Sequence, residues 1–419
     1  MDSTRGKVCR RNRGGGWKWR LFGFGVWLTL ACGQVSAENW PGWRGTGDGV
    51  VQGKPLPRRW DPKLNRAWKV PLSRPSGGSP VVWDDRIFLT QPEEFSASVL
   101  CLSRTDGRLL WRRDVSRIEP SFSRSPSARL TSPSHCDATP VTDGRRLVAL
   151  MGSVVWCLDW DGEELWQREV VNRDPAGGPT ASPVLWNGLC LVVLRDPARI
   201  EALDLSTGET RWTLPLEKAT GFGPKPAVGG LLVSGSAGLR GVRTASGEVD
   251  WLLESVPASA RIEPTWLPRA ALVPGTVQGF TAVNLSRKGL PTVLWTNAAV
   301  GSVAGPGLVI GNRVFVLNDA GEVVCMDPRG GRVLGRRALP GAGEVSVNRI
   351  APIAAAGVLY LPDGSGSVTV LEARPSLDFI AVNSVGEPLT AAPAASDGDL
   401  FLRSGSALWC FREGATPAD

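Results

Sequence analysis

His135, Cys136 and Asp137 form the one cluster in the sequence that combines a base, a thiol and a carboxylate. An imidazole can act as a general base, and all three side chains can bind a metal ion. His135 is the only histidine of the chain, and no nearby glutamate completes a zinc site or a catalytic triad. The pattern favours a polar loop beside a buried cysteine, with a metal or base site as the alternative.

A second set of chemically useful residues lies close to prolines that begin apolar segments. Lys225 and Glu263 each directly precede such a proline, and Arg261 and Arg349 lie three residues before theirs. These side chains could line a pocket for an anionic small molecule, and with His135 and Asp137 they are the candidate cofactor-binding residues. We favour the interpretation that these side chains lie at a solvent-exposed rim and bind no ligand.

The element that would position these residues is a repeat, and its best copy is Glu201–Trp212. A strand end leads through Asp204 into a Ser-Thr-Gly turn, where Gly208 supplies the left-handed backbone of a tight hairpin. A second strand closes on Trp212, a residue that buries about 150–250 Å². Gly335 replaces the tryptophan in one copy, and a copy with a degenerate sequence covers Leu371–Ile380. The predicted docking tryptophans are Trp68, Trp111, Trp166, Trp212, Trp251 and Trp295.

A leading proline marks the start of every repeat. Each is followed by a short apolar strand and, in most copies, by an Asn-Gly, Asp-Gly, Gly-Gly or Gly-Asn turn, which are strong hairpin signals. Most spacings are about 40–45 residues, the length of a four-stranded propeller blade. The eight leading prolines are Pro80, Pro140, Pro183, Pro226, Pro264, Pro306, Pro352 and Pro393.

The ends of the repeat array predict a closed ring. The eighth repeat stops near Phe411 without a fourth strand, and residues 66–71 form an unmatched fourth strand with its tryptophan at the front. Closure leaves no sheet edge between the first and last blades, whereas a solenoid would need capping repeats. We therefore predict an all-β, monomeric, eight-bladed β-propeller of four-stranded antiparallel blades over residues 66–412. A loop insert at 116–134 and a disordered tail at 413–419 complete this prediction.

Residues 38–65 are rich in Trp, Gly and Pro and cannot form a regular helix or a central strand. We expect an ordered lead-in whose tryptophans pack on the propeller. Ligand binding by exposed tryptophans is the alternative.

The basic charge lies mainly in a leader. The chain has 47 Lys and Arg against 40 Asp and Glu, but residues 1–37 hold seven of the basic residues and one acidic residue. The remainder is nearly neutral, which excludes a basic stripe for nucleic acid. A basic start, an apolar stretch at 21–32 and Val35-Ser36-Ala37 predict a signal peptide over residues 1–37. Lipidation of Cys32, a twin-arginine signal at Arg10-Arg11 and a retained membrane anchor remain as alternatives.

Four cysteines occupy the repeat position that Ala202 has in the best copy. That position calls for a small buried residue. Equivalent positions on packed sheets lie about 10 Å apart, too far for a disulfide. Since the chain has no Cys-x-x-Cys pair, a zinc site is also disfavoured. These structural thiols are Cys101, Cys157, Cys325 and Cys410.

The Ala-Leu-Asp-x-x-Thr-Gly-x-x-x-Trp pattern at Ala202–Trp212 resembles the tryptophan-docking motif of PQQ-type quinoprotein β-propellers. The resemblance covers residues 64–412. The lead-in at Asn39–Gly45 and the Trp68-Lys-Val-Pro strand are similar to exported PQQ-like repeat proteins. In this family the docking tryptophans pack between blades, so they indicate fold and not chemistry.

The resemblance implies two functional groups. One comprises dehydrogenases that hold PQQ and a metal ion over the propeller axis, and the other comprises non-catalytic propellers such as the lipoprotein scaffold of the outer-membrane β-barrel assembly machine. The sequence lacks the adjacent cysteine pair of alcohol-type quinoproteins, and no calcium cluster or catalytic base can be assigned. We therefore predict an exported, non-catalytic binding or scaffold module with a protein partner in the cell envelope and no cofactor. A PQQ-dependent oxidoreductase and an outer-membrane assembly lipoprotein are the alternatives.

Overall fold

The computed structural model describes residues 38–416, apart from 94–95, 116–135, 172–180, 228, 257–258, 260–261, 276–278, 286–289 and 341–349. The predicted signal peptide, the loop insert and the last three residues of the predicted tail lie outside the described residues. So do three predicted site residues, His135, Arg261 and Arg349.

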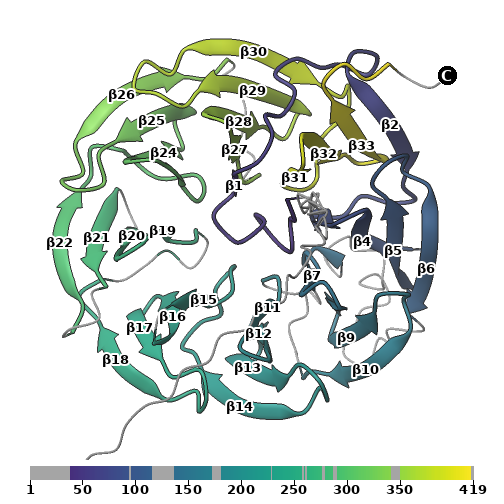
Figure 1. Cartoon of the computed structure of the whole chain (residues 1–419). Coiled ribbons are helices and arrows are strands. Elements are labelled where there is room, and N and C mark those ends of the chain that lie inside the picture. The colour runs from purple at the N-terminus through teal and green to yellow at the C-terminus, as the bar shows by residue number, and fades with distance from the viewer. Residues whose placement is uncertain are drawn as a thin grey trace, which may run out of the picture. The chain divides into compact units, whose positions relative to one another are not determined.

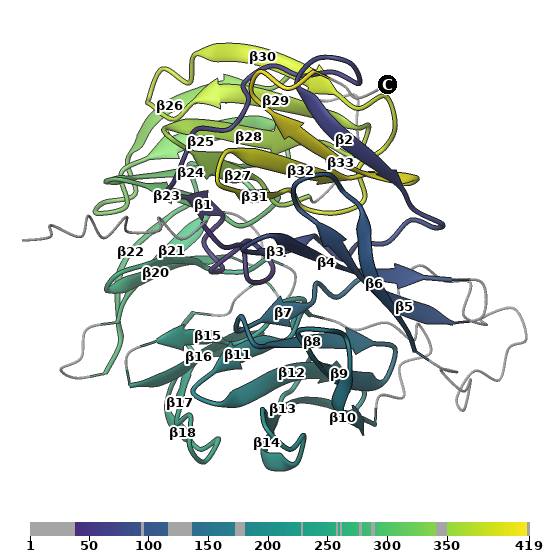
Figure 2. The same cartoon turned by 45° about the vertical axis from the view of Figure 1, so that its right-hand side comes forward.

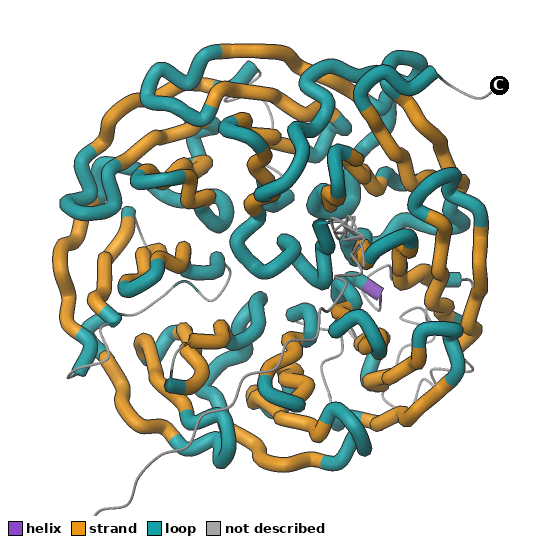
Figure 3. Tube along the Cα trace, viewed as in Figure 1, coloured by secondary structure: helices purple, strands orange, loops and turns teal. Residues whose placement is uncertain are grey.

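The described strands form eight sheets around one axis, which confirms the predicted eight-bladed propeller (Figure 1). Each sheet has four antiparallel strands, and in one sheet a fifth strand joins them in parallel. The first strand of every blade lies beside the axis and the fourth lies on the outer rim (Figure 3).

Blades are numbered in chain order. Blade 1 has strands β3 (Val81–Trp83), β4 (Arg86–Pro92), β5 (Ala97–Ser103) and β6 (Leu109–Val115), and blade 2 has β7 (Val141–Thr142), β8 (Arg146–Met151), β9 (Val154–Asp159) and β10 (Glu164–Glu169). Blade 3 has β11 (Val184–Trp186), β12 (Leu189–Arg195), β13 (Ala198–Asp204) and β14 (Thr210–Pro215), and blade 4 has β15 (Lys225–Ala227), β16 (Gly230–Gly235), β17 (Gly238–Val242) and β18 (Val249–Leu253). Blade 5 has β19 (Thr265–Leu267), β20 (Ala270–Pro274), β21 (Phe280–Asn284) and β22 (Thr292–Asn297), and blade 6 has β23 (Leu308–Ile310), β24 (Arg313–Leu317), β25 (Glu322–Met326) and β26 (Val333–Ala338). Blade 7 has β27 (Ile353–Ala355), β28 (Val358–Pro362), β29 (Ser367–Glu372) and β30 (Phe379–Ser384), with β1 (Val50–Val51) as its parallel fifth strand, and blade 8 has β31 (Ala394–Ser396), β32 (Asp399–Arg403), β33 (Ala407–Arg412) and β2 (Arg66–Pro71).

Neighbouring blades are joined by a tryptophan of one and a glycine turn of the next. The indole Nε1 of Trp166 donates to the carbonyl of Leu205 at 3.1 Å, and a Cβ on Gly208 would lie 2.6 Å from the Trp166 ring. Gly208 also has a φ of +74°, which L side chains rarely adopt. Four other tryptophans make the same pair of contacts: Trp68, Trp111, Trp212 and Trp295.

The copy without a tryptophan is explained by its neighbour. A Cβ on Gly335 would lie 1.8 Å from the carbonyl oxygen of Pro375 in the adjacent blade. Because this backbone fills the space of the indole, no side chain can be accommodated at Gly335.

The four cysteines of the repeat position lie on the third strand of their blades, opposite the docking position of the fourth. Cys101 pairs with Trp111 and Cys157 with Trp166. All four thiols are buried and free, and three of them lie opposite a tryptophan. The other two pairs are Cys325 with Gly335 and Cys410 with Trp68.

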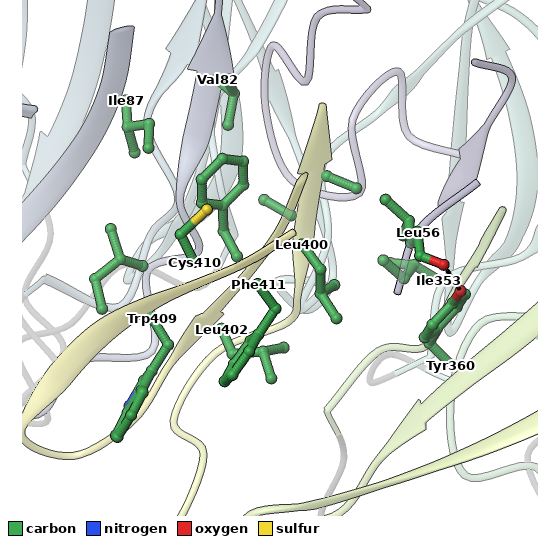
Figure 4. Packing of buried hydrophobic residues seen from close by; sticks show 14 of the residues in the cluster. Leu56, Val82, Ile87, Ile353, Tyr360, Leu400, Leu402, Trp409, Cys410 and Phe411 are labelled. Atoms are coloured by element: carbon green, nitrogen blue, oxygen red, sulfur yellow. Dashed lines mark hydrogen bonds between the residues drawn. The ribbon is translucent and has the colours of Figure 1, made fainter. Parts of the chain in front are cut away.

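The ring closes as the sequence predicts. Strand β2, from the front of the described chain, pairs antiparallel with β33 from its end, so that Lys69 lies opposite Trp409 (Figure 2). The ammonium of Lys69 is 4.1 Å from the centre of the Trp409 ring. Trp409 in turn stacks on Phe411 in the apolar core shown in Figure 4.

The lead-in does not simply lie on the outside of the propeller, because its first residues run through the middle of the ring (Figure 1). Trp40 pairs with Val82 of blade 1, and β1 then pairs with β27 of blade 7. The chain continues outward along blade 7, where Tyr360 donates to the carbonyl of Leu56 at 3.1 Å (Figure 4). Trp40 and Trp60 are buried, each with 2% of its surface exposed. The described residues contain no helix with the length and apolar character needed to span a bilayer.

Candidate functional site

Two cavities lined by the described residues lie near the propeller axis beside the lead-in. The larger, which we call the axial cavity, has a volume of about 620 Å³, within the range of about 300–1,000 Å³ that is usual for ligand pockets. Its walls are the lead-in at 41–47 and the axial ends of blades 2 to 5. The smaller cavity has about 440 Å³ and lies toward blades 1, 7 and 8. Trp43, Gly77 and Asp137 contribute to both.

Arg44 fixes the lead-in at the axis. Its Nη2 donates to the carbonyls of Gly307 at 2.8 Å and Asp48 at 2.9 Å, and its Nη1 lies 4.0 Å from Oε2 of Glu263. The side chain is buried, and this burial lowers the pKa of Arg44, while Glu263 acts in the opposite direction. Gly49 is required beside it, since a Cβ there would lie 2.9 Å from the guanidinium.

Glu263 is the buried acid of the axial cavity. Only 7% of its surface is exposed, and its Oε1 accepts a hydrogen bond from the indole of Trp266 at 3.2 Å. Its Oε2 is buried and has no hydrogen-bond donor among the described residues. Burial raises the pKa of Glu263, and Arg44 and then Lys225 oppose this rise. A buried acceptor without a donor costs free energy, so a group that supplies a hydrogen bond would be stabilised here.

Lys225 supplies a positive charge to the same cavity. It begins β15 of blade 4 and is half-buried, with its ammonium 3.4 Å from the carbonyl of Thr46 in the lead-in. A Cβ on Gly47 would lie 2.7 Å from this ammonium. Lys225 therefore packs directly against the lead-in turn.

Aromatic rings form much of the remaining wall of the axial cavity. Trp43 of the lead-in, Trp186 at the end of β11 and Phe222 before β15 all line it. The rings offer flat apolar surfaces for a ligand, and they can also hold a cation.

The hydroxyl groups just before the leading prolines connect adjacent blades. Ser182 Oγ accepts a hydrogen bond from the backbone N–H of Thr139 at 3.0 Å. Thr139 Oγ1 accepts one from the N–H of Ser79, also at 3.0 Å. These hydroxyls lie near the axis, where they could contact a ligand. The hydrogen bonds that they make instead connect neighbouring blades.

The structure brings three of the predicted site residues together: Asp137, Lys225 and Glu263 all line the axial cavity. Asp137 is exposed, and its Oδ1 accepts a hydrogen bond from the N–H of Gly77 at 2.7 Å. The neighbouring Cys136 is buried, and burial raises its pKa to about 12, so its thiol remains protonated near neutral pH.

Two arginines that the sequence analysis did not select are fully buried near the axis, Arg44 and Arg403. Nη1 of Arg403 donates to the carbonyls of Gly78 at 2.8 Å and Thr90 at 2.9 Å, which joins blade 8 to blade 1. Burial lowers the pKa of Arg403 to about 10. In the sequence, only the position of Arg403 directly after the apolar residues 400–402 indicated that this arginine could be buried.

The described residues do not fit a PQQ and calcium centre of the quinoprotein type. Among them, no three His, Cys, Asp or Glu side chains lie close enough together to hold a metal ion. The guanidinium of Arg44 and the lead-in occupy the axial region beside blades 5 and 6. The described lining of the axial cavity presents a buried acid, Glu263, an exposed acid, Asp137, the ammonium of Lys225 and aromatic rings.

Comparisons with known proteins agree with this architecture. A solved structure of BamB from Moraxella catarrhalis has a TM-score of 0.61 and 13% identity, covering 84% of this chain and 99% of that one. Quinohemoprotein alcohol dehydrogenase from Comamonas testosteroni has a TM-score of 0.62 and 12% identity, covering 91% of this chain and 82% of that one. At these identities the likeness concerns the fold alone.

A curated relative is the serine/threonine-protein kinase AfsK of Streptomyces griseus, which is 30% identical over 251 residues. The match covers 53% of this chain and 29% of the kinase, so this chain spans less than a third of that relative. The family model described as outer membrane protein assembly factor BamB matches residues 150–287 and 280–376, which together make up more than half of the chain. The chain therefore belongs to this family of PQQ-like repeat propellers.

Proposed function

We propose that this chain is an exported, non-catalytic binding module whose axial cavity receives a group from a protein partner in the cell envelope. The observation that carries the proposal is Glu263, which lines a cavity with three aromatic residues and whose buried Oε2 has no hydrogen-bond donor among the described residues. A partner side chain that brings a donor would satisfy this oxygen and cover the rings. The family description, an outer membrane assembly factor, supports a protein as the partner.

A photoreactive amino acid in place of Trp186 tests this proposal in the envelope fraction. Trp83 is the matched control, because it ends the first strand of its blade as Trp186 does but packs on Gly144 instead of lining the axial cavity. We expect a defined protein to be cross-linked from position 186 and not from position 83. The further change Val184→Trp, which fills the cavity, should remove the product. Equal products at both positions, or a product that survives Val184→Trp, would refute the axial site.

Quinone binding is the competing function, since quinoprotein dehydrogenases share the fold. Adding PQQ and Ca²⁺ to the full chain and recording the absorbance of the protein fraction separates the two. We expect no stoichiometric quinone absorbance. Such an absorbance would refute the binding module and favour a redox enzyme.

The family description also favours a specific form of the proposal, in which the module is a lipid-anchored assembly scaffold. Mass spectrometry of the mature N-terminus decides this point. A diacylated Cys32 supports the anchored scaffold, and a free Glu38 supports a released module.

A further inference from the structure

The outer strands of a propeller are open sheet edges, even when the ring itself is closed. An edge strand presents unpaired N–H and C=O groups that can pair with another strand, and natural proteins discourage such pairing with charged side chains. Six of the eight outer strands of this chain carry at least one charged residue. The two without any charged residue are β22, of sequence Thr-Val-Leu-Trp-Thr-Asn, and β30, of sequence Phe-Ile-Ala-Val-Asn-Ser.

The chain covers one of these two strands itself. The lead-in lies along β30, where Arg59 donates to the carbonyl of Ile380 at 2.9 Å and the side chain of Asn383 bonds to the backbone of Arg58 and Trp60 (Figure 2). Arg337 of the adjacent blade lies over the ring of Phe379 at 6.0 Å. An uncharged outer edge is thus protected here by contacts from elsewhere in the fold.

Strand β22 has no segment lying along its outer edge in the described part of the chain, although its Trp295 and Asn297 donate to the carbonyls of Pro328 and Gly331 in blade 6. It is the last strand of its sheet and pairs with β21 alone. Val293 and Leu294 have 44% and 53% of their surface exposed, and Leu290, just before the strand, has 75% exposed. Thr292 and Thr296 add β-branched side chains, which favour an extended backbone. The strand therefore combines an open edge, exposed apolar side chains and the absence of charge.

We infer that β22 is a self-association edge, at which a second copy of this chain pairs antiparallel about a twofold axis. In a twofold antiparallel pair, residues near the axis lie close to their own copies, so a strand whose central charges all have one sign brings like charges together. Strand β26, with Arg336 and Arg337 and no acidic residue, is disfavoured on this ground. Strand β22 meets its copy without such repulsion, and the pair would form one continuous eight-stranded sheet across two rings. The sequence analysis predicts a monomer, but ring closure does not remove this edge.

The test is the molecular mass of the full chain by sedimentation velocity over a concentration series, with the variant Leu294→Lys. We expect a dimer for the unchanged chain, and a dissociation constant at least about tenfold higher for the variant, because residue 294 lies next to the centre of β22 and the two new ammonium groups would lie close together across the pair. Leu165→Lys is the matched control, since Leu165 lies on outer strand β10 and is 51% exposed. It should leave the dimer intact.

A charge-swap mixture separates lost pairing from lost folding. Leu294→Lys and Leu294→Glu chains should each be monomeric alone and should associate when mixed, because unlike charges then meet across the pair. The inference is overturned if the unchanged chain remains monomeric up to about 100 μM, if Leu294→Lys associates as strongly as the Leu165→Lys control, or if the mixture stays monomeric. A heterologous protein that binds at β22 while the chain alone is monomeric would likewise overturn it.

Discussion

Replacing Gly208 by alanine probes the contact that joins blade 2 to blade 3. An alanine at a φ of +74° costs about 1–2 kcal/mol in backbone strain. Its Cβ would also lie 2.6 Å from the ring of Trp166, and overpacking of this kind costs a further 1–3 kcal/mol or so. We therefore expect the unfolding free energy to fall by about 2–5 kcal/mol.

Gly188 supplies the matched control for this change. It lies in the same blade with a φ of +75°, but a Cβ there would meet nothing within 4 Å. Gly188→Ala should therefore show the backbone cost of about 1–2 kcal/mol alone. Urea unfolding of both variants, repeated in a Trp166→Ala background, gives the coupling between ring and turn. The reasoning fails if Gly208→Ala and Gly188→Ala cost the same, or if Trp166→Ala does not reduce the cost of Gly208→Ala.

Three further outcomes are expected. Arg44→Met should lower the unfolding free energy by about 3 kcal/mol and make the lead-in sensitive to protease, because Glu263 would lose its buried cationic partner; unchanged proteolysis would contradict the anchoring role. The folded carboxyl of Glu263 has a raised pKa, so it stabilises the fold at pH values below 4.5, and this stability is lost as the pH rises and the folded carboxyl ionises. Glu263→Gln should therefore become more stable relative to the unchanged chain as the pH rises above 4.5. Equal pH profiles of the two chains in thermal unfolding would contradict this. The thiol of Cys101, whose pKa burial raises to about 12, should react with iodoacetamide at pH 8 only after unfolding, and the buried Cys157 and Cys325 should do the same, as peptide mass spectrometry would show.

The ring could be predicted from the sequence because its signals are local and repeated. A proline, a tight turn and a tryptophan each act within a few residues, and their spacing fixes the number of blades. The leftover strand at residues 66–71 then identified the closing pair, which the structure confirms as Trp68 opposite Cys410. Gly335 was visible as a gap in the pattern, but its cause lies 40 residues away in the carbonyl of Pro375.

The axial site was only partly predictable. Lys225 and Glu263 stood out because they occupy a fixed place in the repeat, directly before a leading proline. Arg44 belongs to no repeat, and its partner Gly307 lies 263 residues away. Nothing in the composition of the lead-in showed that its residues would run through the axis, because that path depends on contacts with blades that are distant in sequence.

Residues at fixed places in the repeat, such as Lys225 and Glu263, and residues outside the repeat, such as Arg44, together explain how a symmetric ring acquires one cavity that differs from the rest. Equivalent positions in eight similar blades would give eight similar surfaces around the axis, so no side of the axis would differ from another. The lead-in removes this equivalence, since Arg44 binds beside blades 5 and 6 and leaves the larger cavity toward blades 2 to 5. Lys225 and Glu263 then face the lead-in, whereas Ala351 and Ala392 occupy the corresponding places at the smaller cavity. The asymmetry of the axial cavity therefore depends on the lead-in, which is not part of the repeat. For the binding function proposed above, changes in the lead-in should alter binding more than changes in the repeated turns.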